Sequence, residues 1–164
     1  MMSRNQARLL LAVCLAVGAS PPGSSARAAE SLVWVEKASE GFISLAYGPL
    51  DPAKVPLFLL SCFDAMGIAV LDIHTQIDGV KPGEALTIEL AAGDAKTRLE
   101  GEAALDEANN MIFAEASDIA VKPVLEVLRQ VGPATVTIGK ASATLSDQGR
   151  ADGVEKFGKD CQID

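Results

Sequence analysis

The chain has 164 residues, of which 14 are Lys or Arg and 22 are Asp or Glu, so its formal charge at pH 7 is −8. Nucleic acids and anionic lipid surfaces both attract clustered basic side chains, and the excess of acid argues against either as a partner. Aromatic residues make up only 4% of the chain, which disfavours surfaces that bind carbohydrates or stack on bases.

The first 28 residues have the order of a secretory signal peptide. Arg4 and Arg8 precede an apolar run at 9–19, and small residues stand at 26 and 28, just before the expected cleavage point. The apolar run is too short to span a bilayer as a helix. We therefore expect export to the periplasm or the medium. Residues 29–164 should then form a single domain with 11 basic and 22 acidic side chains, a net charge of −11.

Cys14 lies inside this apolar run and suggests a lipid anchor as an alternative. The tetrapeptide Leu11-Ala12-Val13-Cys14 resembles a lipoprotein processing site. However, Val13 stands where such sites normally have a small residue, and the apolar run continues beyond Cys14. We expect Cys14 to be discarded with the signal peptide.

From Ser31 onward, short β-type runs are separated by turn residues at the spacing that is typical of a sandwich or barrel. We therefore predict a mainly β fold, an antiparallel β-sandwich or flattened barrel with two short helices. Pro56 lies near the start of the third expected strand, at 55–62, and places that start at the margin of the sheet, because proline has no N–H to donate to a neighbouring strand. The first four strands are expected at 32–36, 42–47 (stopped by Gly48-Pro49), 55–62 and 67–74.

Two hairpins and a further pair of strands should follow. Glycine at positive φ makes Gly93-Asp94 the best turn signal in the chain, and it predicts a hairpin between 84–91 and 96–100. Asn109-Asn110 predicts a second turn, between Leu105 and a strand at 111–116. The last two strands are expected at 135–138 and 141–145.

Two stretches change to a helical period. Ser117-Asp118 can cap a short helix that holds Pro123 in its first turn and ends at Gly132. A closing helix can be capped by Ser146 or Asp147.

The cysteines that remain after cleavage are Cys62, at the end of an apolar strand, and Cys161, on the closing helix beside Val154 and Phe157. In an oxidising compartment we expect a disulfide between them. The chain-entropy model credits so long a loop with about 4–5 kcal/mol. No CxxC pair indicates redox chemistry, and two cysteines with His74 lack a fourth metal ligand. No glycine-rich phosphate loop occurs, so we expect neither metal nor cofactor.

Three other residues are candidates for a functional site. His74 is the only histidine, and with Asp72 beside it in a strand it suggests a hydrolase, although the chain has no G-x-S-x-G elbow. Trp34 and Tyr47 are expected in the core or at its edge. If these two were exposed, they would be, with His74, the candidate binding patch.

Several local patterns resemble small exported proteins of Gram-negative bacteria that have no assigned activity. The similar features are an opening strand with Trp34, the turn at 47–49, a buried strand ending in Cys62, the segment 124–129, and a closing helix with Phe157 before its cysteine. The resemblance implies a periplasmic β-sandwich with a disulfide.

The leading hypothesis is therefore a non-enzymatic periplasmic or secreted binding or accessory protein, whose partner is another envelope protein. A second hypothesis is an inhibitor of a lytic enzyme, such as a lysozyme or protease, because an acidic surface suits a basic target. The third is the hydrolase that uses His74.

Overall fold

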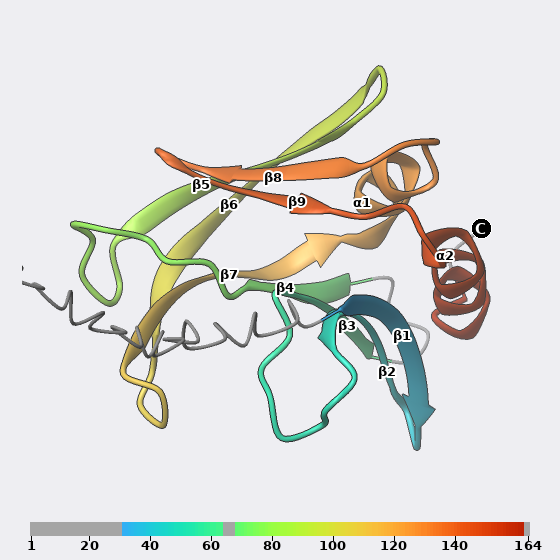
Figure 1. Cartoon of the computed structure of the whole chain (residues 1–164), viewed down its shortest axis with the longest axis horizontal. Coiled ribbons are helices and arrows are strands. Elements are labelled where there is room, and N and C mark those ends of the chain that lie inside the picture. The colour runs from blue at the N-terminus through green and yellow to red at the C-terminus, as the bar shows by residue number, and fades with distance from the viewer. Residues whose placement is uncertain (1–30, 64–67, 163–164) are drawn as a thin grey trace, which may run out of the picture.

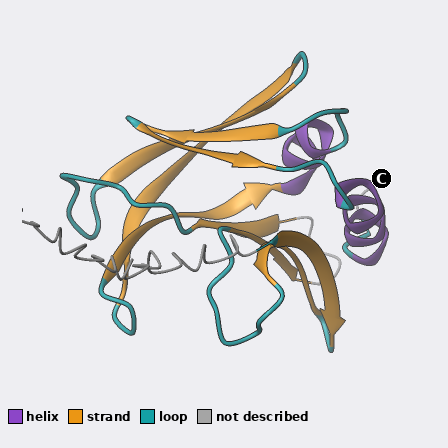
Figure 2. Ribbon diagram, viewed as in Figure 1, coloured by secondary structure: helices purple, strands orange, loops and turns teal. Residues whose placement is uncertain are grey.

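The computed structural model describes residues 31–63 and 68–162, so the expected signal peptide and Cys14 lie outside the described residues. The described chain is mainly β, with two short helices (Figures 1 and 2). Its elements are β1 (Leu32–Ser39), β2 (Phe42–Pro49), β3 (Phe58–Phe63), β4 (Ile68–Ile73), β5 (Ala85–Ala92), β6 (Ala95–Asp106), β7 (Met111–Ala120), α1 (Val121–Leu128), β8 (Ala134–Ile138), β9 (Ala141–Leu145) and α2 (Arg150–Asp160).

All nine strands belong to one antiparallel sheet, in the order β1-β2-β3-β4-β7-β6-β5-β8-β9. The sheet curls into a half-barrel, with β8 and β9 above β1–β4 in Figure 1. The long strand β6 makes the curl possible, because its residues 95–102 pair with β5 while 102–106 pair with β7. The predicted class, an antiparallel sandwich or flattened barrel with two helices, is confirmed.

The core lies on the concave side of this sheet, which we call the inner face. Strand alternation places every second side chain there. In β4, Ala69, Leu71 and Ile73 are buried, whereas Asp72 points to the opposite, outer face. The other inner-face residues that are almost fully buried include Leu45, Phe58, Leu60, Ile88, Leu90, Ala114, Ala116, Val136 and Ile138.

The two helices cover one end of the half-barrel (Figure 1). α1 is strongly amphipathic and packs on β5 and β6, with Val124 and Leu125 fully buried. Pro123 lies in its first turn, where the missing N–H costs no hydrogen bond. α2 packs on β1 and β2 through Val154 and Phe157, both fully buried.

Both predicted helix caps are wrong. Ser117 and Asp118 continue β7, and Ala120 precedes α1 without any side-chain cap. α2 begins after Gly149, whose φ of 75° suits glycine. The side chains of Ser146 and Asp147 accept hydrogen bonds from the Gln148 and Gly132 N–H groups and do not cap the helix.

Several other boundaries also differ from the prediction. The first strand extends to Ser39, and the segments expected as separate strands at 96–100 and at Leu105 form the single strand β6. Gly48 and Pro49 do not stop the second strand. They are the last two residues of β2, and both pair with β1. The third strand starts at Phe58 rather than Val55, so that Pro56 lies in the preceding loop. α1 ends at Leu128, before Gly132. Strand pairing carries β2 through its local turn signal, whereas Pro56, which cannot donate a ladder hydrogen bond, stays outside β3.

Candidate functional site

The predicted disulfide is present and links β3 to the end of α2. Cys62 and Cys161 are separated by 99 residues in sequence, and each is 1% exposed. The bond joins the C-terminal helix to the inner face of the sheet. Because both sulfurs are buried among apolar side chains, the geometry is that of a structural tie rather than of a reactive thiol pair.

Trp34 and Tyr47 lie together, but not on the surface as a patch. Their rings are 5.0 Å apart on the inner face, and Phe58 stacks edge-on against Trp34 at 5.5 Å. Tyr47 is buried, and the Trp34 indole donates a 2.6 Å hydrogen bond to the Ser146 carbonyl. Trp34 therefore joins β1 to the segment after β9, and Tyr47 packs against the Trp34 ring.

His74 lies away from that aromatic pair, on the outer face of the sheet. Its ring stacks on Phe113 at 4.5 Å and hydrogen-bonds the Pro56 backbone, while Nδ1 is buried without a hydrogen-bond partner. Burial lowers the pKa of His74, and the negative charge of Asp106 partly opposes this shift. A histidine base needs a nucleophile within hydrogen-bond reach. The contacts of His74 that are described above include no nucleophile, so they do not support the hydrolase hypothesis.

A row of carboxylates crosses the outer face next to His74. The strand register places Asp72 of β4 directly opposite Glu115 of β7, and Glu115 opposite Glu102 of β6. Desolvation and the neighbouring Glu115 raise the pKa of Asp72 to about 6. Asp72 Oδ1 is buried without a partner. Like charges in direct cross-strand positions repel one another, so this row is a strained acidic surface.

A groove of about 300 Å³ lies on the outer face over β1, β2 and β3, and we call it the outer-face groove. Its floor is formed by Val33 and Val35 of β1, Ala46 of β2 and Leu59 of β3. The loop between β2 and β3 walls it with several prolines. Other lining residues are Lys37, Ser44, Gly48, Pro49, Leu50, Asp51, Pro52, Lys54 and Pro56.

Gly48 allows the loop to fold over the groove. A Cβ at this position would lie 2.6 Å from Pro56 Cα, closer than real contacts allow. Leu50, one of the residues that line the groove, remains 71% exposed. This groove was not predicted from the sequence. The available signal was the alternation of Val33 and Val35 with inward-facing residues, beside a loop that is dense in proline.

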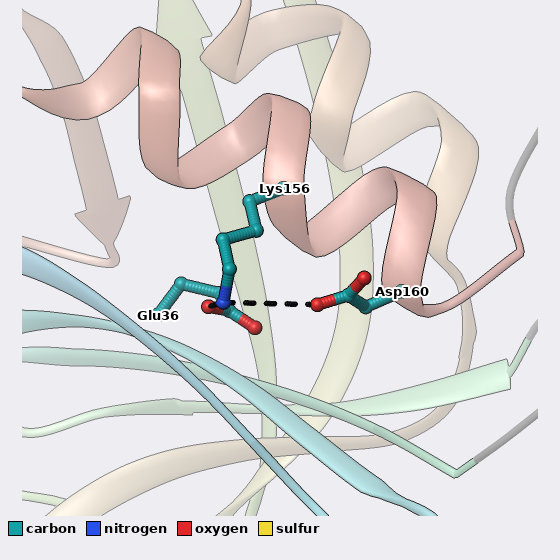
Figure 3. A network of polar contacts seen from close by, with 3 residues as sticks. All are labelled: Glu36, Lys156 and Asp160. Carbon is teal, nitrogen blue, oxygen red and sulfur yellow. Dashed lines mark hydrogen bonds and ion pairs between the residues drawn. The ribbon is translucent and has the colours of Figure 1, made fainter.

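An ion-pair network fastens α2 to β1 (Figure 3). Lys156 bonds the Glu36 carboxylate and lies 3.7 Å from an Asp160 oxygen. The Glu36 side chain is 3% exposed, whereas that of Lys156 is 59% exposed. The hydrogen bond to Glu36 is the main cause that raises the pKa of Lys156. This buried carboxylate depends on one lysine for its compensating charge.

Within residues 31–63 and 68–162, no cluster of three or more His, Cys, Asp or Glu side chains could hold a metal ion. In the same part of the chain, no helix has the length and apolar character needed to cross a membrane. Comparisons with protein-family models, curated proteins and solved structures find no match to this chain.

Proposed function

We propose that this chain is an exported, non-catalytic binding protein that captures an extended segment of another envelope protein alongside β1. The observation that carries the proposal is the combination of an unpaired sheet edge with the outer-face groove beside it. An edge strand offers backbone hydrogen bonds to an added strand, and an adjacent apolar groove selects its side chains.

β1 provides the edge. It is eight residues long, ends the sheet, and pairs only with β2 among the described strands. Its inner face is already covered by α2, so the side chains of an added strand would make their selective contacts on the outer face. An edge strand of this length, with no described strand on its other side, is a natural template for strand addition.

The groove favours an extended segment whose alternate residues are apolar. Side chains on one face of such a strand would reach Val33, Val35 and Leu59, which are half-buried. Lys37 lies at the groove and forms no ion pair within the described part of the chain, so it suits a carboxylate on the partner. The net negative charge opposes pairing between two copies of the chain, which favours a different protein as the occupant.

Export is part of the proposal. The disulfide supports it, because such bonds persist in oxidising compartments. The amino-terminal pattern of basic, apolar and small residues supports it as well. Mass spectrometry of the protein purified from its own cells should find residues 1–28 missing and two hydrogens fewer than in the reduced chain. An intact Met1 with free thiols would contradict export.

Peptide selection tests the binding function. We expect a displayed library of random dodecapeptides, panned against the oxidised domain, to yield sequences in which apolar residues alternate. Their binding should slow hydrogen exchange of β1 amides, because these amides gain partners. Leu50→Asp places a charge at the groove rim and should weaken binding by at least about tenfold.

Val131→Asp is the matched control, since Val131 is 92% exposed and lies in the loop after α1, outside the lining of the groove. This variant should bind the selected peptides as the parent does. Failure of the library to enrich would overturn the proposal, as would peptides that bind the Leu50→Asp variant and the parent equally. A dimer that forms through β1 and excludes the peptides would assign the edge to a second copy.

A second candidate function is inhibition of a basic lytic enzyme. The row formed by Asp72, Glu115 and Glu102 favours it, because three adjacent carboxylates are complementary to a basic cleft. We expect the oxidised domain to inhibit lysozyme, and the Glu102→Gln variant to inhibit it less. Lack of inhibition at high micromolar concentration would remove this candidate.

A further inference from the structure

A second cavity, of about 490 Å³, opens at the end of the half-barrel away from the helices. It lies between the loop that joins β4 to β5 and the turn that joins β8 to β9. The mouth of a curled sheet is a common place for small-molecule sites, and this volume is within the usual range of about 300–1,000 Å³.

The floor of this cavity is apolar and belongs to the edge of the core. Ile138 is 1% exposed and Ile77 is 8% exposed, so both are held in place by packing. Val80 and Leu86 are half-buried and pack against the same core. The floor therefore offers a preformed apolar surface to a ligand.

Two opposite charges stand at the rim, one on each side. Asp78 belongs to the β4–β5 loop, where its carboxylate accepts a 3.0 Å hydrogen bond from the Gln76 amide. Lys140 belongs to the β8–β9 turn and is exposed. Within the described part of the chain, neither charge takes part in an ion pair. Each is therefore available to a ligand.

We infer that this cavity binds a small zwitterion with an apolar side chain, the chemical class of the hydrophobic amino acids. Asp78 would accept hydrogen bonds from the ammonium group and Lys140 would donate to the carboxylate, while the side chain lies on the apolar floor. A ligand with a carboxylate alone would meet repulsion from Asp78, and one with an ammonium alone would meet repulsion from Lys140. This inference is independent of peptide capture at β1.

Three probes with the same aromatic body test it: L-phenylalanine, 3-phenylpropionate and phenethylamine. Titration of the isotopically labelled oxidised domain with L-phenylalanine should shift the amide signals of 76–80 and 138–141. The other two probes should bind at least about tenfold more weakly, because each lacks one of the two charges. Equal binding of all three probes would overturn the inference, as would no response to any of them.

Charge-removing variants separate the two roles. Lys140→Gln should abolish the preference for L-phenylalanine over phenethylamine, and Asp78→Asn should abolish the preference over 3-phenylpropionate. Lys96→Gln removes an exposed charge outside the lining of the cavity and should leave both preferences unchanged. Signals outside the cavity report whether each variant is folded. Retention of both preferences in a folded Asp78→Asn or Lys140→Gln variant would refute the assigned roles.

Discussion

Two side chains on the outer face respond to pH in opposite directions. The pKa of Asp72 is raised to about 6 in the folded chain, so between about pH 4 and 6 the folded state binds its proton more tightly than the unfolded state does. The contribution of Asp72 to the free energy of unfolding therefore falls as pH rises across that window. The pKa of His74 is lowered, so through His74 stability falls as pH drops below about 6.5.

The Asp72→Asn substitution should isolate the first response. At pH 7.5 the variant should be more stable than the parent by about 1 kcal/mol, after allowance for solvent screening of a half-buried carboxylate, because it no longer buries a desolvated charge and no longer repels Glu115. Near pH 4 the gain should vanish, since Asp72 is then protonated. Urea unfolding at both pH values measures this. Glu89→Gln, at an exposed site on β5, is the control, and an equal gain in that variant would contradict the explanation.

The Glu36 carboxylate makes a second prediction at the scale of one residue. Lys156→Met leaves this buried charge without its partner, so the variant should unfold at a lower urea concentration than the parent. Adding Glu36→Gln should recover part of the loss, because the unpaired charge is removed. Lys159→Met changes an exposed lysine on the same helix and should have little effect. If the double variant were less stable than Lys156→Met, the pair would not be coupled as described.

Among the secondary-structure elements, α2 has the most varied attachment to the sheet. Its apolar side chains are buried on β1 and β2, Lys156 bonds Glu36, and Cys161 at its end is bonded to Cys62. The helix itself contains Gly153 and Gly158, which weaken helix propensity. Its stability must therefore come from these tertiary contacts.

Replacing both cysteines by serine should destabilise the domain by about 4–5 kcal/mol in the chain-entropy model, since the bond closes a loop across 99 residues. That loss is comparable to the whole stability of a small domain. Equilibrium unfolding of the oxidised parent and the Cys62→Ser/Cys161→Ser variant measures it. The native bond should also resist dithiothreitol, because both sulfurs are buried. Rapid reduction without denaturant, or a loss below about 1 kcal/mol, would contradict a structural role.

The elements that were predicted correctly from sequence are those in which local preference and burial agree. The hairpin at Gly93-Asp94 formed as expected, because glycine, here at φ 52°, meets the turn geometry while apolar alternation sets both strands. The pairing of Cys62 with Cys161 followed from composition, since residues 29–164 contain no other cysteine.

The elements that were missed depend on contacts between distant segments. Ser117 and Asp118 look like a helix cap, but pairing of β4 with residues 119 and 120 carries β7 on to Ala120. The outer-face groove needs the β2–β3 loop to fold over Gly48, which no local pattern announces. Asp78 and Lys140 line the same cavity at the mouth of the half-barrel only because the sheet curls. Such sites require the register and curvature of the sheet, which a single sequence does not specify.

The shape of the whole molecule depends on the point where β6 leaves β5 and pairs with β7. Gly101 lies at this point, and a Cβ there would come within 2.4 Å of the Glu115 carbonyl oxygen. The obstacle is backbone, so it cannot turn aside as a side chain could. A glycine in a strand often marks such a close approach, and here it lets the sheet bend into a half-barrel.

Gly101→Ala should therefore destabilise the protein by about 1–3 kcal/mol, the usual cost of overpacking. Gly153→Ala is the matched control, because its added Cβ would meet the end of the Leu45 side chain at 3.1 Å and the helix would gain propensity. We expect this second variant to lie close to the parent in thermal unfolding. Equal stability of the Gly101→Ala variant and the parent would show that the bend does not depend on this contact.

The placement of the cysteines also bears on how the chain matures. If the chain is exported and cut after Ala28, as we propose, a thiol at Cys62 has a single intramolecular partner, and that partner would emerge 99 residues later during passage out of the cytoplasm. Scrambled monomers cannot arise, so a disulfide isomerase has nothing to correct within one molecule. The error left to quality control is a covalent link between two molecules whose Cys62 thiols are exposed before Cys161 arrives.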